Sequence, residues 1–185
     1  RSNDSKFWSD RIAIVLNNSD LEISDSDYDT KTKKFAGKLK SKSIDPQDIA
    51  LFVPQLSHLT KLITLETEAE GELPYINVKK LITTYGDDTH VDISGSIAAY
   101  SKYNTADIDI DIRQLKFSPD DLEGFIRIDM PDYVLPQQLR ATGNMDAHLT
   151  IRGKLSRFTY EGIVFTDQGD VVLSGGVGGG DKSFR

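Results

Sequence analysis

The sequence predicts a mainly β protein with two short helical inserts. The clearest observation is segment 106–113, in which isoleucine and aspartate alternate without a break. Only an extended strand, whose successive side chains point to opposite faces, puts the three isoleucines on one side and the carboxylates on the other. Much of the remaining chain repeats this two-faced pattern, with β-branched residues that suit a half-buried sheet. The functional question is what the apolar faces cover: a second sheet, or something that is not protein.

Length and composition are ordinary for a soluble globular chain. The 185 residues are 38% hydrophobic and 28% charged. The formal net charge of -7 argues against nucleic acid or an anionic membrane surface as the main partner. Cysteine is absent, which excludes disulfides, thiolate metal sites and cysteine nucleophiles. The chain begins with Arg1 and Ser2 rather than with methionine, so we expect a piece of a longer protein.

The N-terminal part is predicted to form strands joined by polar turns. The apolar run 11–16 is short enough for a strand, and the polar residues 17–20 are a turn signal. Alternation resumes at 21–24, and residues 33–40 are expected to return as a strand. Between them, 25–29 is similar to the opening of a calcium loop, but the glycine and glutamate that such a loop needs are missing. We therefore expect a solvated turn there.

Two segments change from a strand pattern to a helix pattern. In the first, Asp45 can cap a helix that begins at Pro46, and Pro54 limits this helix to two or three turns. In the second, Ser118 and Pro119 occupy the same two positions. We therefore expect one short helical insert at each place.

The strands after the second insert repeat those after the first. The expected strands are 62–70, 75–84 and 90–97 in the first set, and 146–153, 158–166 and 169–177 in the second. A copied unit of roughly 75 to 80 residues indicates a supersecondary structure stacked on itself. The chain is accordingly divided into N-terminal strands (1–42), a first repeat (43–105), a second repeat (106–177) and a flexible tail (178–185).

The order of these segments resembles the order found in a known protein family. The run 42–56 is similar to the short helical insert of TamB-type translocation and assembly proteins, which belong to the AsmA-like repeating β-groove lipid-transfer proteins. The strand and turn segments that share the resemblance are 73–81, 85–89, 153–158 and 169–171. The resemblance extends from about Leu21 to Val177 and includes no catalytic signature.

The resemblance implies a curled antiparallel β-sheet, or gutter, with an apolar interior, in a long periplasmic protein anchored in the inner membrane. Such a protein is expected to carry phospholipid acyl chains toward the outer membrane and to support outer-membrane protein assembly beside an Omp85-type barrel. The anchor and the barrel contact are expected in the full-length protein, and the fragment itself is expected to be soluble. The alternative is a closed β-sandwich that serves as an interaction module of an extracellular surface protein.

A gutter of alternating strands leaves a continuous apolar stripe for acyl chains. Each buried methylene would gain about 0.8 kcal/mol without any specific hydrogen bond. The candidate lining is Val91, Ile93, Ile97, Ile108, Ile110, Ile112, Leu149, Ile151, Ile163, Phe165, Val171 and Leu173. For each of these residues the alternative is a place in a closed sandwich core. The inserts are expected either to plug the mouth of the gutter, with Leu51, Phe52, Leu122 and Phe125, or to pack as loops.

Enzymatic signatures are weak, and we expect no catalysis, no cofactor and no metal. His58, His90 and His148 are isolated along the chain, so we expect surface positions rather than metal ligation. The sequence has no Gly-x-Ser-x-Gly nucleophile elbow. The aspartates of 106–113 could suggest a metal site or a glycosidase pair, but we expect them on the solvated face of the strand.

Overall fold

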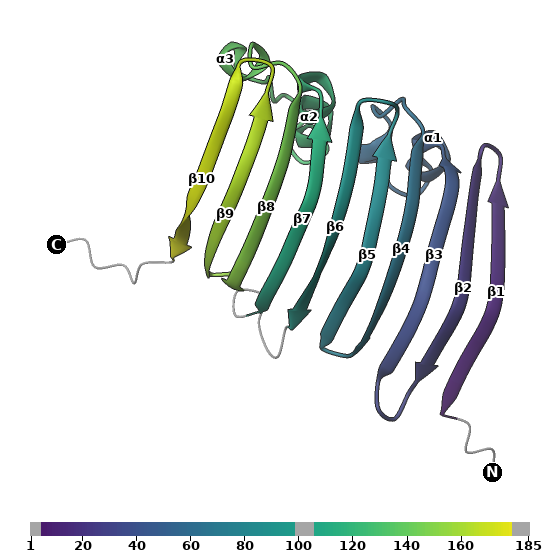
Figure 1. Ribbon diagram of the computed structural model, residues 1–185. Helices are drawn as coiled ribbons and strands as arrows, with labels where there is room; N and C mark the ends of the chain where they lie inside the picture. The colour runs from purple at the N-terminus through teal and green to yellow at the C-terminus, as the bar shows by residue number, and fades with distance from the viewer. Residues whose placement is uncertain (1–4, 99–105, 179–185) are drawn as a thin grey trace.

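The computed structural model describes residues 5–98 and 106–178. Ten strands in these ranges form one antiparallel sheet, in which neighbours in sequence are also neighbours in space (Figure 1). The strands are β1 (Lys6–Leu16), β2 (Ser19–Asp29), β3 (Lys34–Ile44), β4 (Ile63–Glu72), β5 (Tyr75–Tyr85), β6 (Thr89–Ala98), β7 (Asp107–Phe117), β8 (Met145–Lys154), β9 (Arg157–Thr166) and β10 (Gly169–Gly178). The predicted mainly β, curled antiparallel sheet is confirmed, and this sheet is open, with β1 and β10 at its two edges.

The alternative of a closed sandwich is wrong for the described residues. All ten of their strands belong to the one sheet, so these strands provide no second sheet to cover its apolar side. Close contacts between strands join neighbours within the sheet. The buried apolar side chains lie mostly near strand ends and in the inserts: Leu59, Tyr85, Ala98, Ala106, Ile108, Leu135 and Ala147.

Two helical inserts lie at the same end of the sheet (Figure 1). The first insert joins β3 to β4 and contains α1 (Pro46–Ala50) and the short 3-10 helix η1 (Pro54–Leu56). The second insert joins β7 to β8 and contains α2 (Pro119–Ile126) and α3 (Gln137–Arg140). The four strands β4 to β7 separate the first insert from the second, and the three strands β8 to β10 follow the second.

Both predicted helix starts are confirmed. The Asp45 carboxylate accepts a hydrogen bond from the Gln47 amide, and the Ser118 hydroxyl accepts one from the Asp121 amide. However, α1 has only 5 residues and is shorter than expected. Val53, which precedes Pro54, has φ -129° and ψ 81°, and the residue before a proline avoids the helical region.

Bulges keep the apolar side chains on one face along the whole length of the strands. The register shifts between Val78 and Leu81 in β5, and between Ile112 and Leu115 in β7. An additional residue in a bulged strand resets the alternation, so residues three apart in sequence share a face. The apolar positions of neighbouring strands therefore stay opposite one another.

Two expectations about polar segments change. Residues 25–29 lie within β2 rather than in a turn, and the turn that follows is at 30–33. The ion pair between Asp25 and Lys38, at 2.8 Å, explains how an acidic run is accommodated in a strand. Gly178 is the last residue of β10, and the rest of the expected flexible tail, 179–185, lies outside the described residues.

Candidate functional site

The candidate site is the apolar face, defined as the five rows of side chains that the register connects across β3 to β10. Its middle row is Leu39, Thr67, Leu81, Ile93, Ile112, Leu149, Gly162 and Leu173. In these eight strands, the positions of the face carry no Asp, Glu, Lys, Arg or His. The face is therefore uncharged across its described extent.

The structure places ten of the predicted lining residues on the apolar face. These are Val91, Ile93, Ile97, Ile108, Ile110, Ile112, Leu149, Ile151, Val171 and Leu173. Ile163 and Phe165 point to the opposite face, because Gly162 pairs with Leu149 and Leu173 while Phe165 pairs with Asp146 and Asp170. Their grouping with the other ten is corrected accordingly.

These ten side chains are incompletely covered. Ile108 is 7% exposed, but Ile97 is 37% and Val171 is 49% exposed, and the other seven have intermediate burial. Aliphatic residues in a closed core are usually fully buried. A contiguous exposed apolar surface is typical of an interaction site for protein, ligand or membrane.

A hollow of about 340 Å³ lies in the centre of the apolar face. Gly95 is among the residues that line it. The side chains of this face that line it are Val78, Leu81, Ile93, Ile97, Ile110, Ile112 and Ile151. Hollows of this size and polarity are typical of sites for apolar ligands. Val78 and Leu81 are absent from the predicted lining because the bulge between them hides their shared face.

The other side of the sheet, the charged face, carries ion pairs between neighbouring strands. Arg152 lies 3.1 Å from Asp109, Lys79 lies 2.6 Å from Glu70, and Arg113 contacts Asp92. The hydrogen bond from Arg113 lowers the pKa of Asp92. The aspartates of 106–113 thus lie on a solvated face, where cross-strand pairs align the strands but each contributes little stability.

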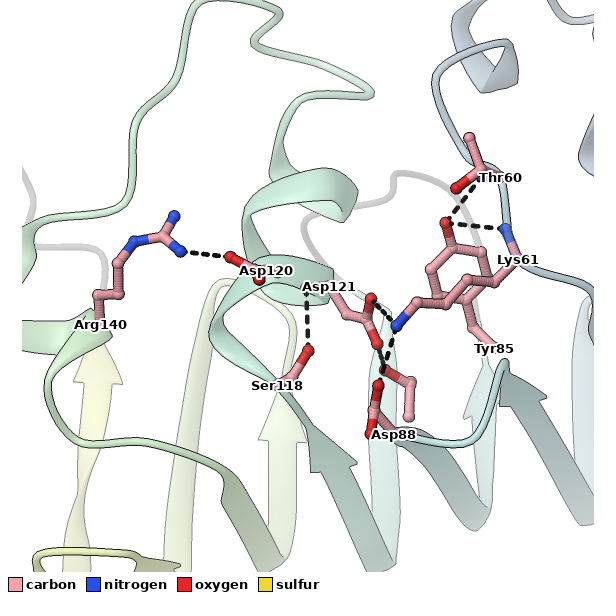
Figure 2. A network of polar contacts seen from close by, with 9 residues as sticks. Thr60, Lys61, Tyr85, Asp88, Ser118, Asp120, Asp121 and Arg140 are labelled. Carbon is pink, nitrogen blue, oxygen red and sulfur yellow. Dashed lines mark hydrogen bonds and ion pairs between the residues drawn. The ribbon is translucent and has the colours of Figure 1, made fainter.

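The inserts contact one end of the apolar face. Tyr85 and Thr89 belong to its outermost row. The Tyr85 hydroxyl accepts a hydrogen bond from the Thr60 amide at 3.0 Å (Figure 2). The Tyr85 ring lies 5.2 Å from the ring of Phe125. Phe125 therefore packs at the border of the face, whereas Leu51 and Phe52 of the first insert are 76% and 78% exposed. Leu122 has intermediate burial.

A buried carboxylate is central to the contact between the two inserts. Asp121 is 4% exposed and accepts a hydrogen bond from the Thr89 hydroxyl at 2.8 Å. It also accepts one from Lys61 Nζ at 2.7 Å (Figure 2). Lys61 also contacts Asp88 at 3.1 Å. The hydrogen bond to Asp121 is the main reason why the pKa of Lys61 is raised. Lys61 therefore pairs with two carboxylates, and the negative charges of this cluster exceed its one positive charge.

The three histidines lie in different environments. His58 Nε2 is 2.8 Å from the Gly124 carbonyl oxygen, between the two inserts. His148 packs edge-on against Phe165 on the charged face, and His90 pairs with Lys116 in the sheet. In the part of the chain that the structure describes, no three acidic or histidine side chains are arranged to hold a metal ion.

The comparison of the chain with protein-family models, curated proteins and solved structures gives no match. The helices within residues 5–98 and 106–178 are all too short or too polar to cross a membrane. The geometry of the apolar face is therefore the main basis for a functional conclusion.

Proposed function

We propose that the apolar face binds phospholipid acyl chains, and that the chain is a segment of a TamB-like periplasmic bridge protein. The observation that carries this proposal is the uncharged face itself, which runs across eight strands and includes an apolar hollow. No described strand covers it. Such a surface is costly to leave in water, and hydrocarbon is a chemically matched occupant.

The dimensions of the apolar face suit acyl chains. Eight strands at a spacing of about 4.8 Å span about 34 Å from β3 to β10. One phospholipid tail occupies about half of a hydrocarbon core that is about 30 Å thick. The face is thus long enough for about two tails placed end to end across the strands.

The chemistry of the face favours tails over head groups. Burying each methylene gains about 0.8 kcal/mol and needs no directional partner. The face has no charged side chain from β3 to β10 with which to select a phosphate or an amine. We therefore expect lipids with different head groups to bind with similar affinity.

The wider role rests on the family resemblance of the sequence. In this proposal the full-length protein is anchored in the inner membrane and spans the periplasm. Its β-groove carries phospholipid toward the outer membrane and supports outer-membrane protein assembly with an Omp85-type barrel. The described segment contributes a stretch of the groove, and the barrel contact belongs to the full-length protein.

Binding of a fluorescent fatty acid to two matched variants tests the proposal. Ile110→Glu places a carboxylate beside the central hollow, whereas Thr159→Glu places the same charge on the charged face. We expect Ile110→Glu to weaken binding by about tenfold or more, because an acyl chain would desolvate the new charge, and Thr159→Glu to bind like the wild type.

Circular dichroism checks that both variants are folded. Because Ile110 is only half-buried, the charge is expected to leave the sheet intact. Equal binding by both variants, or no binding by the wild type, would contradict the proposal and would favour a protein-binding module.

A further inference from the structure

The two inserts are attached to the sheet by the same contact at equivalent positions. Asp48 and Asp121 are each the third residue of a helix that begins with proline, and they are 6% and 4% exposed. Asp48 accepts a hydrogen bond from the Ser19 hydroxyl at 2.7 Å, as Asp121 accepts one from Thr89 at 2.8 Å. Ser19 and Thr89 are the first residues of β2 and β6, which lie four strands apart.

The other donors differ between the two carboxylates. The Asn18 backbone amide donates to Asp48 at 3.0 Å and the Asn17 side-chain amide at 3.1 Å, whereas Lys61 donates to Asp121 at 2.7 Å. A buried carboxylate with several donors is held firmly, because hydrogen bonds to charged groups are stronger than those between neutral groups. The contact between aspartate and hydroxyl recurs while the other donors differ, which indicates that this contact is the shared element of the repeat.

The contact brings the second insert onto the border of the apolar face. Thr89 and Tyr85 are in the outermost row of that face, and Asp121 and Phe125 of α2 lie against them. Leu59 of the first insert is 3% exposed, and its methyl group lies within 3.8 Å of the position that a Cβ at Gly124 would occupy. The two inserts are thus continuous with each other along the end of the sheet.

We propose that Asp48 and Asp121 are positioning residues that fix the inserts as a wall along one side of the acyl-chain groove. The wall limits the escape of a bound chain toward that end of the strands. The second half of this statement rests on the proposed function, because it identifies what the wall retains. The first half, the attachment of the insert by the aspartate and the hydroxyl, does not depend on any ligand.

The polar hollow at this border is better explained as part of the attachment than as a ligand site. It has a volume of about 480 Å³ and is lined by Lys61, Asp88, Asp121, Glu123 and Arg127, among others. Lys61 contacts both aspartates, and Arg127 contacts Glu123 at 2.6 Å. The acidic side chains that line the hollow, which also include Asp120, outnumber its two basic side chains, so the hollow offers a phosphate or carboxylate no net attraction.

Two substitutions at Thr89 separate the hydroxyl from the shape of the side chain. Thr89→Val keeps the volume and removes the donor to Asp121, whereas Thr89→Ser keeps the donor. Amide hydrogen exchange in 118–126 and the release rate of a bound fluorescent fatty acid are measured for both variants and for the wild type. We expect Thr89→Val to accelerate both by about tenfold, since the bond to a buried carboxylate is lost, and Thr89→Ser to match the wild type.

The outcomes distinguish this inference from the proposed function. Unchanged exchange of 118–126 in Thr89→Val would overturn the attachment, and faster exchange with unchanged fatty-acid release would overturn the wall. Accelerated exchange throughout β7 and β8 would also overturn it, because the hydroxyl would then support the whole sheet. If the wild type binds no fatty acid, the proposed function fails, while the exchange data still decide whether the aspartate attaches the insert.

Discussion

At the scale of the residue, position 95 on the apolar face has no room for a side chain. Gly95 has φ +153°, and a Cβ there would lie 2.3 Å from the Asp109 carbonyl oxygen and 2.8 Å from the Ile110 Cα. Both atoms belong to the backbone of the neighbouring strand, so a side chain could be accommodated only by moving β7. Gly95 also lines the central hollow.

Gly95→Ala is therefore expected to destabilise the protein by about 1 to 3 kcal/mol, the usual range for a residue forced into an unfavourable backbone conformation. The free energy of unfolding is measured by urea denaturation. Gly178→Ala in β10 is the matched control, because a Cβ there has nothing within 4 Å and should leave the stability nearly unchanged. Equal stability of Gly95→Ala and the wild type would contradict this expectation, because it would show that β7 can move at little cost to make room for the Cβ.

The side of the sheet on which a residue lies was predictable only where alternation is strict. Segment 106–113 alternates without exception, so its isoleucines were placed correctly. In β9, Ile163, Val164 and Phe165 are consecutive and apolar, so the pattern does not show which of them share a face. The turn at Leu155 and Ser156 determines it, because pairing Lys154 with Arg157 places Tyr160 opposite Ile151.

At the scale of the element, the inserts depend on carboxylates held in their charged form. Glu123 of α2 accepts a hydrogen bond from the Leu135 amide at 2.9 Å and contacts Arg140 at 2.5 Å. The Leu135 bond is the main reason why the pKa of Glu123 is lowered. In the first insert, the bond from Ser19 is the main reason why the pKa of Asp48 is lowered.

Both inserts should therefore loosen in acid. A carboxyl whose pKa is lower in the folded state stabilises that state above its unfolded pKa, and this stabilisation is lost as the pH falls through the folded pKa. We expect hydrogen exchange in α2, corrected for the intrinsic pH dependence of exchange, to show less protection at about pH 3 than at about pH 6. Glu123→Gln should reduce this difference. An equal pH dependence in the variant and the wild type would contradict the role assigned to Glu123.

The starts of the inserts were predictable from sequence, but their place on the sheet was not. Asp45 with Pro46, and Ser118 with Pro119, are local signals that act within a few residues. The contact of Asp121 with Thr89 joins residues 32 positions apart and becomes visible only when the register of the sheet is known. Helix α3 was not predicted, since its first residue follows Pro136 without any side-chain cap.

At the scale of the whole molecule, the two faces of the sheet differ in charge. One face is uncharged from β3 to β10, and no described strand lies over it. On the opposite face, ion pairs join neighbouring strands. The overall class and the two-faced strands follow from alternation in the sequence. The openness of the sheet does not, because the same alternation suits a closed sandwich, and only the order of strands distinguishes the two.

The most direct test of the central claim is mass spectrometry of organic extracts from the folded, purified protein, expressed in a bacterium and washed free of loosely bound lipid. We expect phospholipid in roughly stoichiometric amount, with head groups in about the proportions of the host membrane. Extracts of Ile110→Glu should contain much less. A wild-type protein that is folded, carries no phospholipid and takes up none from vesicles would contradict the claim that the apolar face is a site for acyl chains.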